Sequence, residues 1–163
     1  ALSTSQASVS ISTEQLQQAY ALARIINHVQ GFELIKTAAL KYQWGINCSE
    51  LARIWTNGCI IRSTLMEQLT GIVSADNLLL HPLIITSIQQ QLDSLTQTVT
   101  ASLQSGIAVP ALCEALHYIH AMSTEQSAMN LIQAQRDYFG AHTYQRIDDA
   151  SGKAYHTQWK NEN

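Results

Sequence analysis

The sequence predicts an all-α fold, in which several helices pack around one long central helix and an irregular C-terminal tail follows. Three observations support this class. Apolar residues recur at three- and four-residue steps along most of the chain, which is the helical period. Capping residues, glycines and prolines stand where these patterns begin and end. No segment shows the alternation of apolar and polar residues, bounded by turns, that marks a sheet.

The first element is the predicted central helix. Residues 1–12 are rich in serine, lack the features of a signal peptide and are expected to form a flexible lead-in. Ser12 and Gln15 then match a capping box, and a helical pattern runs to about Tyr42. Thirty residues at about 1.5 Å each give roughly 45 Å of helix. The stretch 32–40 is apolar on most sides, which predicts that it is buried.

Two shorter helices are predicted next. Gly45 is expected to end the central helix. Asn47 is a suitable N-cap for a helix over 48–56, and residues 60–72 have a third helical pattern. Between them, the Asn57–Gly58 pair predicts a turn.

Prolines and glycines delimit the remaining helices. Pro82 suits the first position of a helix that runs to about Ser105, where Gly106 stops it. Pro110 opens a helix to about residue 121. The last predicted helix begins at Ser123 or Thr124, which offer an N-cap, and extends to Tyr138. After Gly140 no period is sustained. The predicted division is therefore a helical domain over 13–145 and a C-terminal arm over 146–163.

Composition excludes several function classes. The chain has 163 residues, which suits one domain with a buried core, but only 13% are charged, well below the usual quarter. The surface must therefore be polar and uncharged, or be covered by a partner. A net charge of -3 gives no basic field for nucleic acid, and no apolar run is long enough for a membrane span. Three cysteines without metal-type spacing favour a reduced, cytoplasmic protein.

Motifs for cofactors and metals are missing from the sequence. It contains no Gly-rich dinucleotide fingerprint and no P-loop. His117 and His120 lie three residues apart on a predicted helix, where a metal would need a further ligand that is not near. Two ordinary histidines are the simpler interpretation, and we predict no metal site.

Two segments carry candidate anion-binding residues. Arg62 follows the turn at Gly58 and lies at the start of the predicted third helix, where free N–H groups and a guanidinium would favour an anion. An ordinary surface arginine is the alternative. Arg136 lies at the end of the last helix, and His142 follows in a loop. A cation suits a helix C-terminus for dipole reasons alone, yet both side chains could also converge on one phosphate.

These segments resemble one enzyme family. The runs 58–63 (GCIIRS) and 132–144 (IQAQRDYFGAHTY) are similar, almost letter for letter, to decarboxylating 6-phosphogluconate dehydrogenases. Further similarity, at 30–32 (QGF), 78–80 (LLL) and the tail 156–159, extends the resemblance from about residue 13 to 159. It is specific because the shared runs are long.

The resemblance implies a function and partners. Members oxidise 6-phosphogluconate with NADP and release CO2 to give ribulose 5-phosphate, as dimers in the cytoplasm. It implies that Arg62 holds the substrate phosphate within its own subunit, whereas Arg136 and His142 reach into the neighbouring subunit's site. The arm is expected to thread across the partner subunit.

The resemblance covers only the family's helical C-terminal part. The family's NADP-binding Rossmann domain and its catalytic lysine and glutamate have no counterpart here, and neither Glu33 nor Lys36 lies in the corresponding motif. We therefore predict no catalytic residue and no NADP site in these residues, and no activity of the isolated chain. The alternatives are a stand-alone helical module for dimerisation or regulation, or an unrelated structural helical domain.

Overall fold

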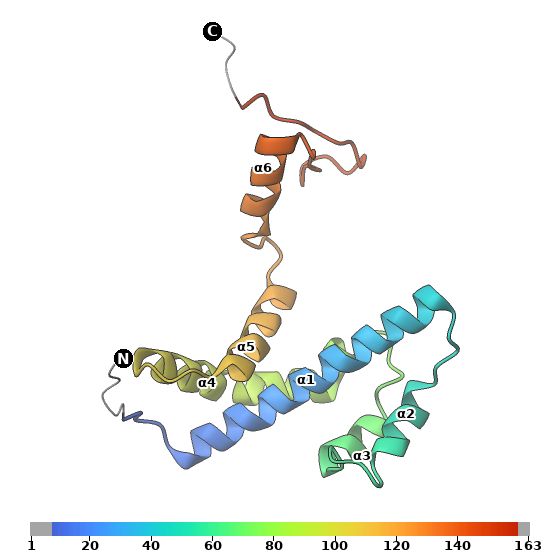
Figure 1. Cartoon of the computed structure of the whole chain (residues 1–163), viewed down its shortest axis with the longest axis vertical. Coiled ribbons are helices and arrows are strands. Elements are labelled where there is room, and N and C mark those ends of the chain that lie inside the picture. The colour runs from blue at the N-terminus through green and yellow to red at the C-terminus, as the bar shows by residue number, and fades with distance from the viewer. Residues whose placement is uncertain (1–7, 160–163) are drawn as a thin grey trace, which may run out of the picture. The chain divides into compact units, whose positions relative to one another are not determined.

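The computed structural model describes residues 8–159 and confirms the all-α fold (Figure 1). The chain divides into two compact units, Ala1–His120 and Ala121–Asn163. Within the described residues, extended pairing is limited to an isolated antiparallel bridge between Tyr144 and Tyr155.

The first unit is built on α1, Thr13–Tyr42 (Figure 1). The predicted capping box is present: Ser12 Oγ accepts the Gln15 N–H at 3.1 Å, and Gln15 Oε1 accepts the Ser12 N–H at 2.9 Å. The helix ends before Gly45, the predicted stop, because Gln43 already adopts the left-handed conformation with φ 56°. A left-handed residue at this position ends a helix whether or not it is glycine.

Two short helices follow, α2 (Cys48–Trp55) and α3 (Thr64–Thr70). Asn47 caps α2 as predicted, and its side chain accepts a backbone N–H of the first turn at 3.1 Å. The prediction of a helix over 60–72 is wrong at its start. Ser63 is the N-cap of α3, and the residues before it form a turn after Gly58 rather than a helical turn.

The next two helices begin where the prolines predict. A 3₁₀ turn, η1 (Leu78–Leu80), leads into α4 (Pro82–Gln104). Proline suits this first position because its missing N–H would have no helical partner there. Gly106, with φ 72°, follows the end of α4, and α5 spans Pro110–Ser123.

Buried side chains form two clusters that share α1. The first half of α1 packs with α4 and α5, and its second half packs with α2, α3 and η1. The largest fully buried apolar side chains of this unit are Leu22, Ile26, Val29, Phe32, Met66, Leu69, Val73, Leu78 and Leu95. Each such side chain contributes about 1.5–3 kcal/mol by leaving water. The predicted central helix is thus confirmed.

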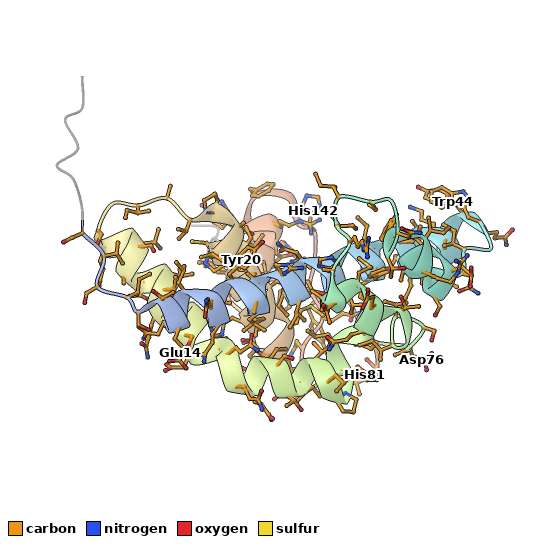
Figure 2. All side chains as sticks on the ribbon, turned by 90° about the horizontal axis from the view of Figure 1, so that it is seen from below. Glu14, Tyr20, Trp44, Asp76, His81 and His142 are labelled. Atoms are coloured by element: carbon orange, nitrogen blue, oxygen red, sulfur yellow. The ribbon has the colours of Figure 1, made fainter. Side chains whose placement is uncertain are left out.

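The burial predicted for the stretch 32–40 is confirmed only at Phe32. Leu34 is 70% exposed and Leu40 is 82% exposed. Tyr20 and Trp44, in and just beyond the same helix, are also more than half exposed (Figure 2). The stretch 32–40 is apolar on most sides, but within this unit neighbouring helices cover only part of its surface.

Glu33 and Lys36 have a structural role in this unit. Lys36 Nζ donates to Glu33 Oε1 at 2.9 Å and to the Ala75 carbonyl oxygen at 2.6 Å. The same Glu33 oxygen accepts the Leu78 N–H at 2.9 Å. Together the two side chains hold the segment before η1 against α1.

The second unit contains α6, Met129–Gly140, and the irregular tail predicted after it. The predicted N-cap at Ser123 or Thr124 is wrong, because α5 continues through Ser123 and α6 starts after Ala128. The N-cap residue, Ala128, makes no side-chain cap hydrogen bond, but Ser127 Oγ accepts the Met129 N–H at 3.3 Å.

Candidate functional site

Arg62 lies in a turn of the first unit, two residues before α3. Gly58 has φ 70°, which glycine adopts readily, and the Arg62 N–H donates to the Cys59 carbonyl oxygen at 3.1 Å. Ser63 caps α3, and its Oγ accepts the Met66 N–H at 3.2 Å, so one of the free N–H groups near Arg62 already has a partner. The Arg62 side chain itself is exposed, and no hydrogen bond to it is found within residues 8–159.

Arg136 lies in α6, just before its last turn, in the second unit. Its side chain is exposed, and its Nη1 is 3.4 Å from Gln133 Oε1, a weak contact. Large apolar side chains of α6 are exposed as well: Met129, Leu131, Ile132, Tyr138 and Phe139. The guanidinium therefore keeps most of its donors available, on a helix whose apolar side chains are not covered within this unit.

The loop that carries His142 has a special backbone. Ala141 and Thr143, on either side of His142, both have positive φ, 49° and 61°. Such conformations cost about 1–3 kcal/mol for residues other than glycine, so surrounding contacts must hold them. The Thr143 N–H donates to Asp137 Oδ1 at 3.0 Å, and the Thr143 carbonyl oxygen accepts from Gln133 Nε2. Both ends of this residue are therefore fixed to α6.

The His142 ring lies against the end of α6. A Cβ atom placed on Gly140 would be 2.8 Å from His142 Cδ2 and 2.9 Å from Nε2, closer than side chains normally approach. The ring also makes an edge contact with Phe139, with centroids 6.0 Å apart. The missing side chain at Gly140 thus makes room for the imidazole, which is otherwise exposed.

Asp137 is the buried centre of this unit. Its side chain is 0% exposed, and four donors surround the carboxylate within 3.0 Å. Thr143 N and His156 Nδ1 contact Oδ1, while Thr157 N and Trp159 Nε1 contact Oδ2. Burial alone raises the pKa of Asp137, but the bonds from Thr157, His156, Trp159 and Thr143 outweigh it and hold the pKa well below its usual range.

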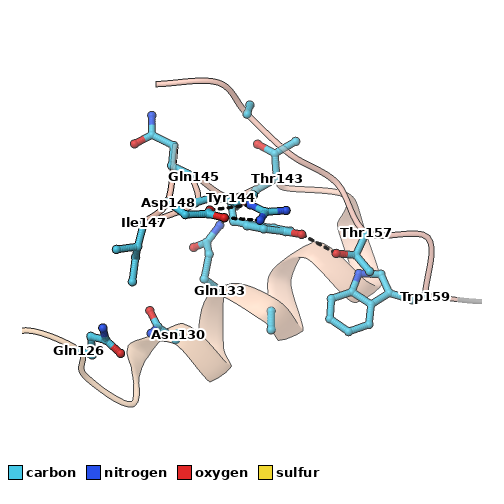
Figure 3. A pocket seen from close by; sticks show the side chains of 13 residues that line it. Gln126, Asn130, Gln133, Thr143, Tyr144, Gln145, Ile147, Asp148, Thr157 and Trp159 are labelled. Carbon is cyan, nitrogen blue, oxygen red and sulfur yellow. Dashed lines mark hydrogen bonds and ion pairs between the residues drawn. The ribbon is translucent and has the colours of Figure 1, made fainter. Parts of the chain in front are cut away.

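The tail forms one wall of an open cavity of about 810 Å³ beside α6 (Figure 3). Backbone bonds at 2.9 and 2.8 Å pair Tyr144 with Tyr155, and the Tyr144 hydroxyl shares a hydrogen bond of 2.7 Å with Thr157 Oγ1. Arg146 forms an ion pair with Asp148 at the rim. The lining is largely uncharged, and its two opposite charges neutralise each other.

Residues 8–159 contain no cluster of side chains suited to a metal ion. His117 lies 3.8 Å from Glu114 on α5, and both are exposed. None of the helices in the described part of the chain has the length and apolar character that crossing a membrane requires.

The structure brings two of the three predicted site residues together in one unit. Arg136 and His142 flank the end of α6, where a guanidinium and an imidazole can both donate to an anion. Arg62 belongs to the other unit. Sequence reasoning gave no role to Asp137, Gln133 or Gly140. The sequence held one signal for Asp137: an acidic residue in the last turn of a helix is destabilised by the helix dipole.

Comparison with known proteins gives a consistent result. A sequence profile of the 6-phosphogluconate dehydrogenase C-terminal domain matches residues 2–159. The decarboxylating 6-phosphogluconate dehydrogenase of Buchnera aphidicola (subspecies Baizongia pistaciae) is 40% identical over 150 residues, which cover 90% of this chain and 32% of that protein. The enzyme of Dictyostelium discoideum is 37% identical over 90% of this chain and 30% of its own length.

A solved structure agrees in fold. The 6-phosphogluconate dehydrogenase of Plasmodium falciparum, determined in apo form, with its cofactor NADP+ and with its substrate 6-phosphogluconate, superimposes with a TM-score of 0.83 at 34% identity. The match covers 90% of this chain and 32% of that one. The chain therefore spans about a third of the length of the relatives it matches.

Proposed function

This chain belongs to the 6-phosphogluconate dehydrogenase family, whose C-terminal domain it matches, and we propose that it serves an NADP-dependent enzyme that oxidatively decarboxylates 6-phosphogluconate to ribulose 5-phosphate. Its part is to bind the substrate phosphate and to form the dimer interface. The observation that carries this proposal is the pair of exposed donors, Arg136 and His142, at the end of one helix within the matched region. The cytoplasm is the proposed compartment.

Three side chains are proposed to share one phosphate. Arg62 contributes from its own subunit, and Arg136 and His142 contribute from the neighbouring subunit. Arg62 lies in a different compact unit from the other two. Phosphate contacts supply binding energy remote from the reacting carbon, and that energy positions the substrate for hydride transfer.

The domains have separate proposed tasks. Residues 13–145 provide the helical substrate-binding and dimerisation domain, and residues 146–163 form the arm that crosses the partner. The described residues contain neither a parallel sheet nor a Gly-rich turn for a dinucleotide, so they do not fit NADP, which the family's Rossmann domain would hold. The isolated chain is expected to reduce no NADP with 6-phosphogluconate.

Calorimetric titration of the chain with 6-phosphogluconate tests the phosphate contacts. Arg62→Ala, Arg136→Ala and His142→Ala should each weaken binding about tenfold or more, because each removes a charge-assisted hydrogen bond. Arg53→Ala is the matched control, since Arg53 is exposed and paired with Glu50 at 2.8 Å. Wild-type affinity in all three site variants would contradict the proposal and favour a non-catalytic dimerisation module.

Mixed dimers test the assembly from two subunits. Arg62→Ala and Arg136→Ala chains are combined after denaturation and refolding. If the site crosses subunits, each mixed dimer has one site with both arginines intact, and tight binding returns. If both arginines come from one chain, every site in the mixture lacks an arginine, and mixing restores nothing.

A further inference from the structure

Asp137 is fully buried, yet none of its four partners is an arginine or a lysine. Its neighbour in sequence, Arg136, is exposed and does not pair with it. A buried carboxylate is costly unless it is hydrogen-bonded. Here every hydrogen bond to the carboxylate comes from a donor outside α6. Its bonds reach the loop at Thr143 and the tail at 156–159. The carboxylate therefore ties two segments to the helix.

The loop tied in this way is the one that carries His142. Thr143 has its N–H held by Asp137 at 3.0 Å and its carbonyl held by Gln133. With Ala141 also in the left-handed region, the backbone on either side of His142 has little freedom. The direction in which the His142 side chain leaves the backbone is thereby set.

The position of the His142 ring is set from the other side by Gly140. The ring atoms Cδ2 and Nε2 lie where a Cβ on Gly140 would be 2.8 and 2.9 Å away. Any side chain at residue 140 would push the imidazole aside, at little cost to the backbone, because the ring is exposed and movable.

We propose that Asp137 and Gly140 are positioning residues that hold the His142 imidazole where it can donate to the substrate phosphate. Asp137 fixes the backbone of the loop, and Gly140 provides the space for the ring. This inference rests on the proposed function, because it takes His142 as a phosphate ligand. Neither residue touches the phosphate.

The first test is Asp137→Asn in the full 163-residue chain. Asparagine keeps the size of the side chain but replaces one carboxylate oxygen with an NH2 group. This group cannot accept a hydrogen bond from the donors that face it. Calorimetry should show an affinity for 6-phosphogluconate about tenfold weaker, as for His142→Ala. The matched control is Asp148→Asn, which removes the same charge from an exposed ion pair in the same unit and should bind like wild type.

Double variants separate positioning from a general structural role. Asp137→Asn should add no further loss to His142→Ala, because the histidine through which it acts is gone. It should add its full loss to Arg136→Ala, because the helix that carries the arginine is intact. A loss that persists undiminished in the His142→Ala background would overturn the proposal.

Gly140→Ala keeps the proposal testable if Asp137→Asn does not fold. It leaves the carboxylate network unchanged, so the thermal unfolding midpoint should not fall, while affinity falls about tenfold. Wild-type affinity in Gly140→Ala would overturn the proposal. If His142→Ala itself binds like wild type, the proposed role of His142 as a phosphate ligand fails instead, and the two failures are thereby distinguished.

Discussion

At the scale of single residues, Asp137 shows how a charge is buried without a counter-charge. Two backbone N–H groups, an indole N–H and an imidazole surround it. Hydrogen bonds to a charged acceptor are about twice as strong as neutral ones, and four of them replace the lost water. The unit depends on this residue because it has few buried apolar side chains of its own.

The depressed pKa of Asp137 predicts how the second unit responds to acid. A carboxyl whose pKa is lower in the folded state stabilises the fold above its ordinary value, near 3.8, and loses that contribution as the pH falls toward the folded pKa. The Trp159 indole N–H signal in NMR should keep its folded position at pH 5 and at pH 4, and should shift only on stronger acidification.

Asp137→Asn is the comparison for this titration. It should shift the indole signal already at pH 5 and remove its acid dependence. A wild-type signal that changes between pH 7 and pH 5 instead would show that another group controls the unit.

At the scale of elements, capping residues decide where helices begin. The capping box of Ser12 and Gln15 starts the helix on which both core clusters depend. Ser12→Ala should lower the free energy of unfolding by about 1 kcal/mol, because the Gln15 N–H loses its acceptor. Urea denaturation measures this change. Ser10→Ala, outside the cap, is the control, and equal effects in both variants would refute the argument.

Local sequence predicted the elements whose ends are set by local contacts. The starts of α1, α2, α4 and α5 follow from a cap or a proline within three residues, and the structure confirms them. The start of α6 was wrong because the serine chosen as its cap belongs to α5. The role of Asp137 was missed because three of its four partners lie 19 to 22 residues away, beyond any local pattern.

At the scale of the whole molecule, the chain has fewer charged residues than soluble proteins usually have, and it exposes large apolar side chains. Only 13% of residues are charged, and large apolar side chains are exposed on α1 and α6. Exposed apolar side chains mark interaction surfaces in soluble proteins where they form a contiguous patch. The proposed dimer would cover them.

Light scattering tests the proposed dimer directly. The mass at micromolar concentration should be twice 18.0 kDa, because interfaces of standard size with apolar cores persist at that dilution. Truncation after Tyr144 should shift the mass toward one chain, since it removes the arm. A single-chain mass for the intact protein would contradict the proposed dimer, and an unchanged dimer after truncation would contradict the role of the arm.

The distance in sequence between Asp137 and its partners also has a consequence during translation. When α6 emerges from the ribosomal exit tunnel, the donors at His156, Thr157 and Trp159 still lie inside the tunnel. The carboxylate must stay hydrated until they appear, because burying it alone is costly. A stop codon between residues 145 and 155 would therefore yield a polypeptide that contains His142 but lacks three of the four donors to Asp137, and we expect the loop of His142 to lose its fixed orientation in it.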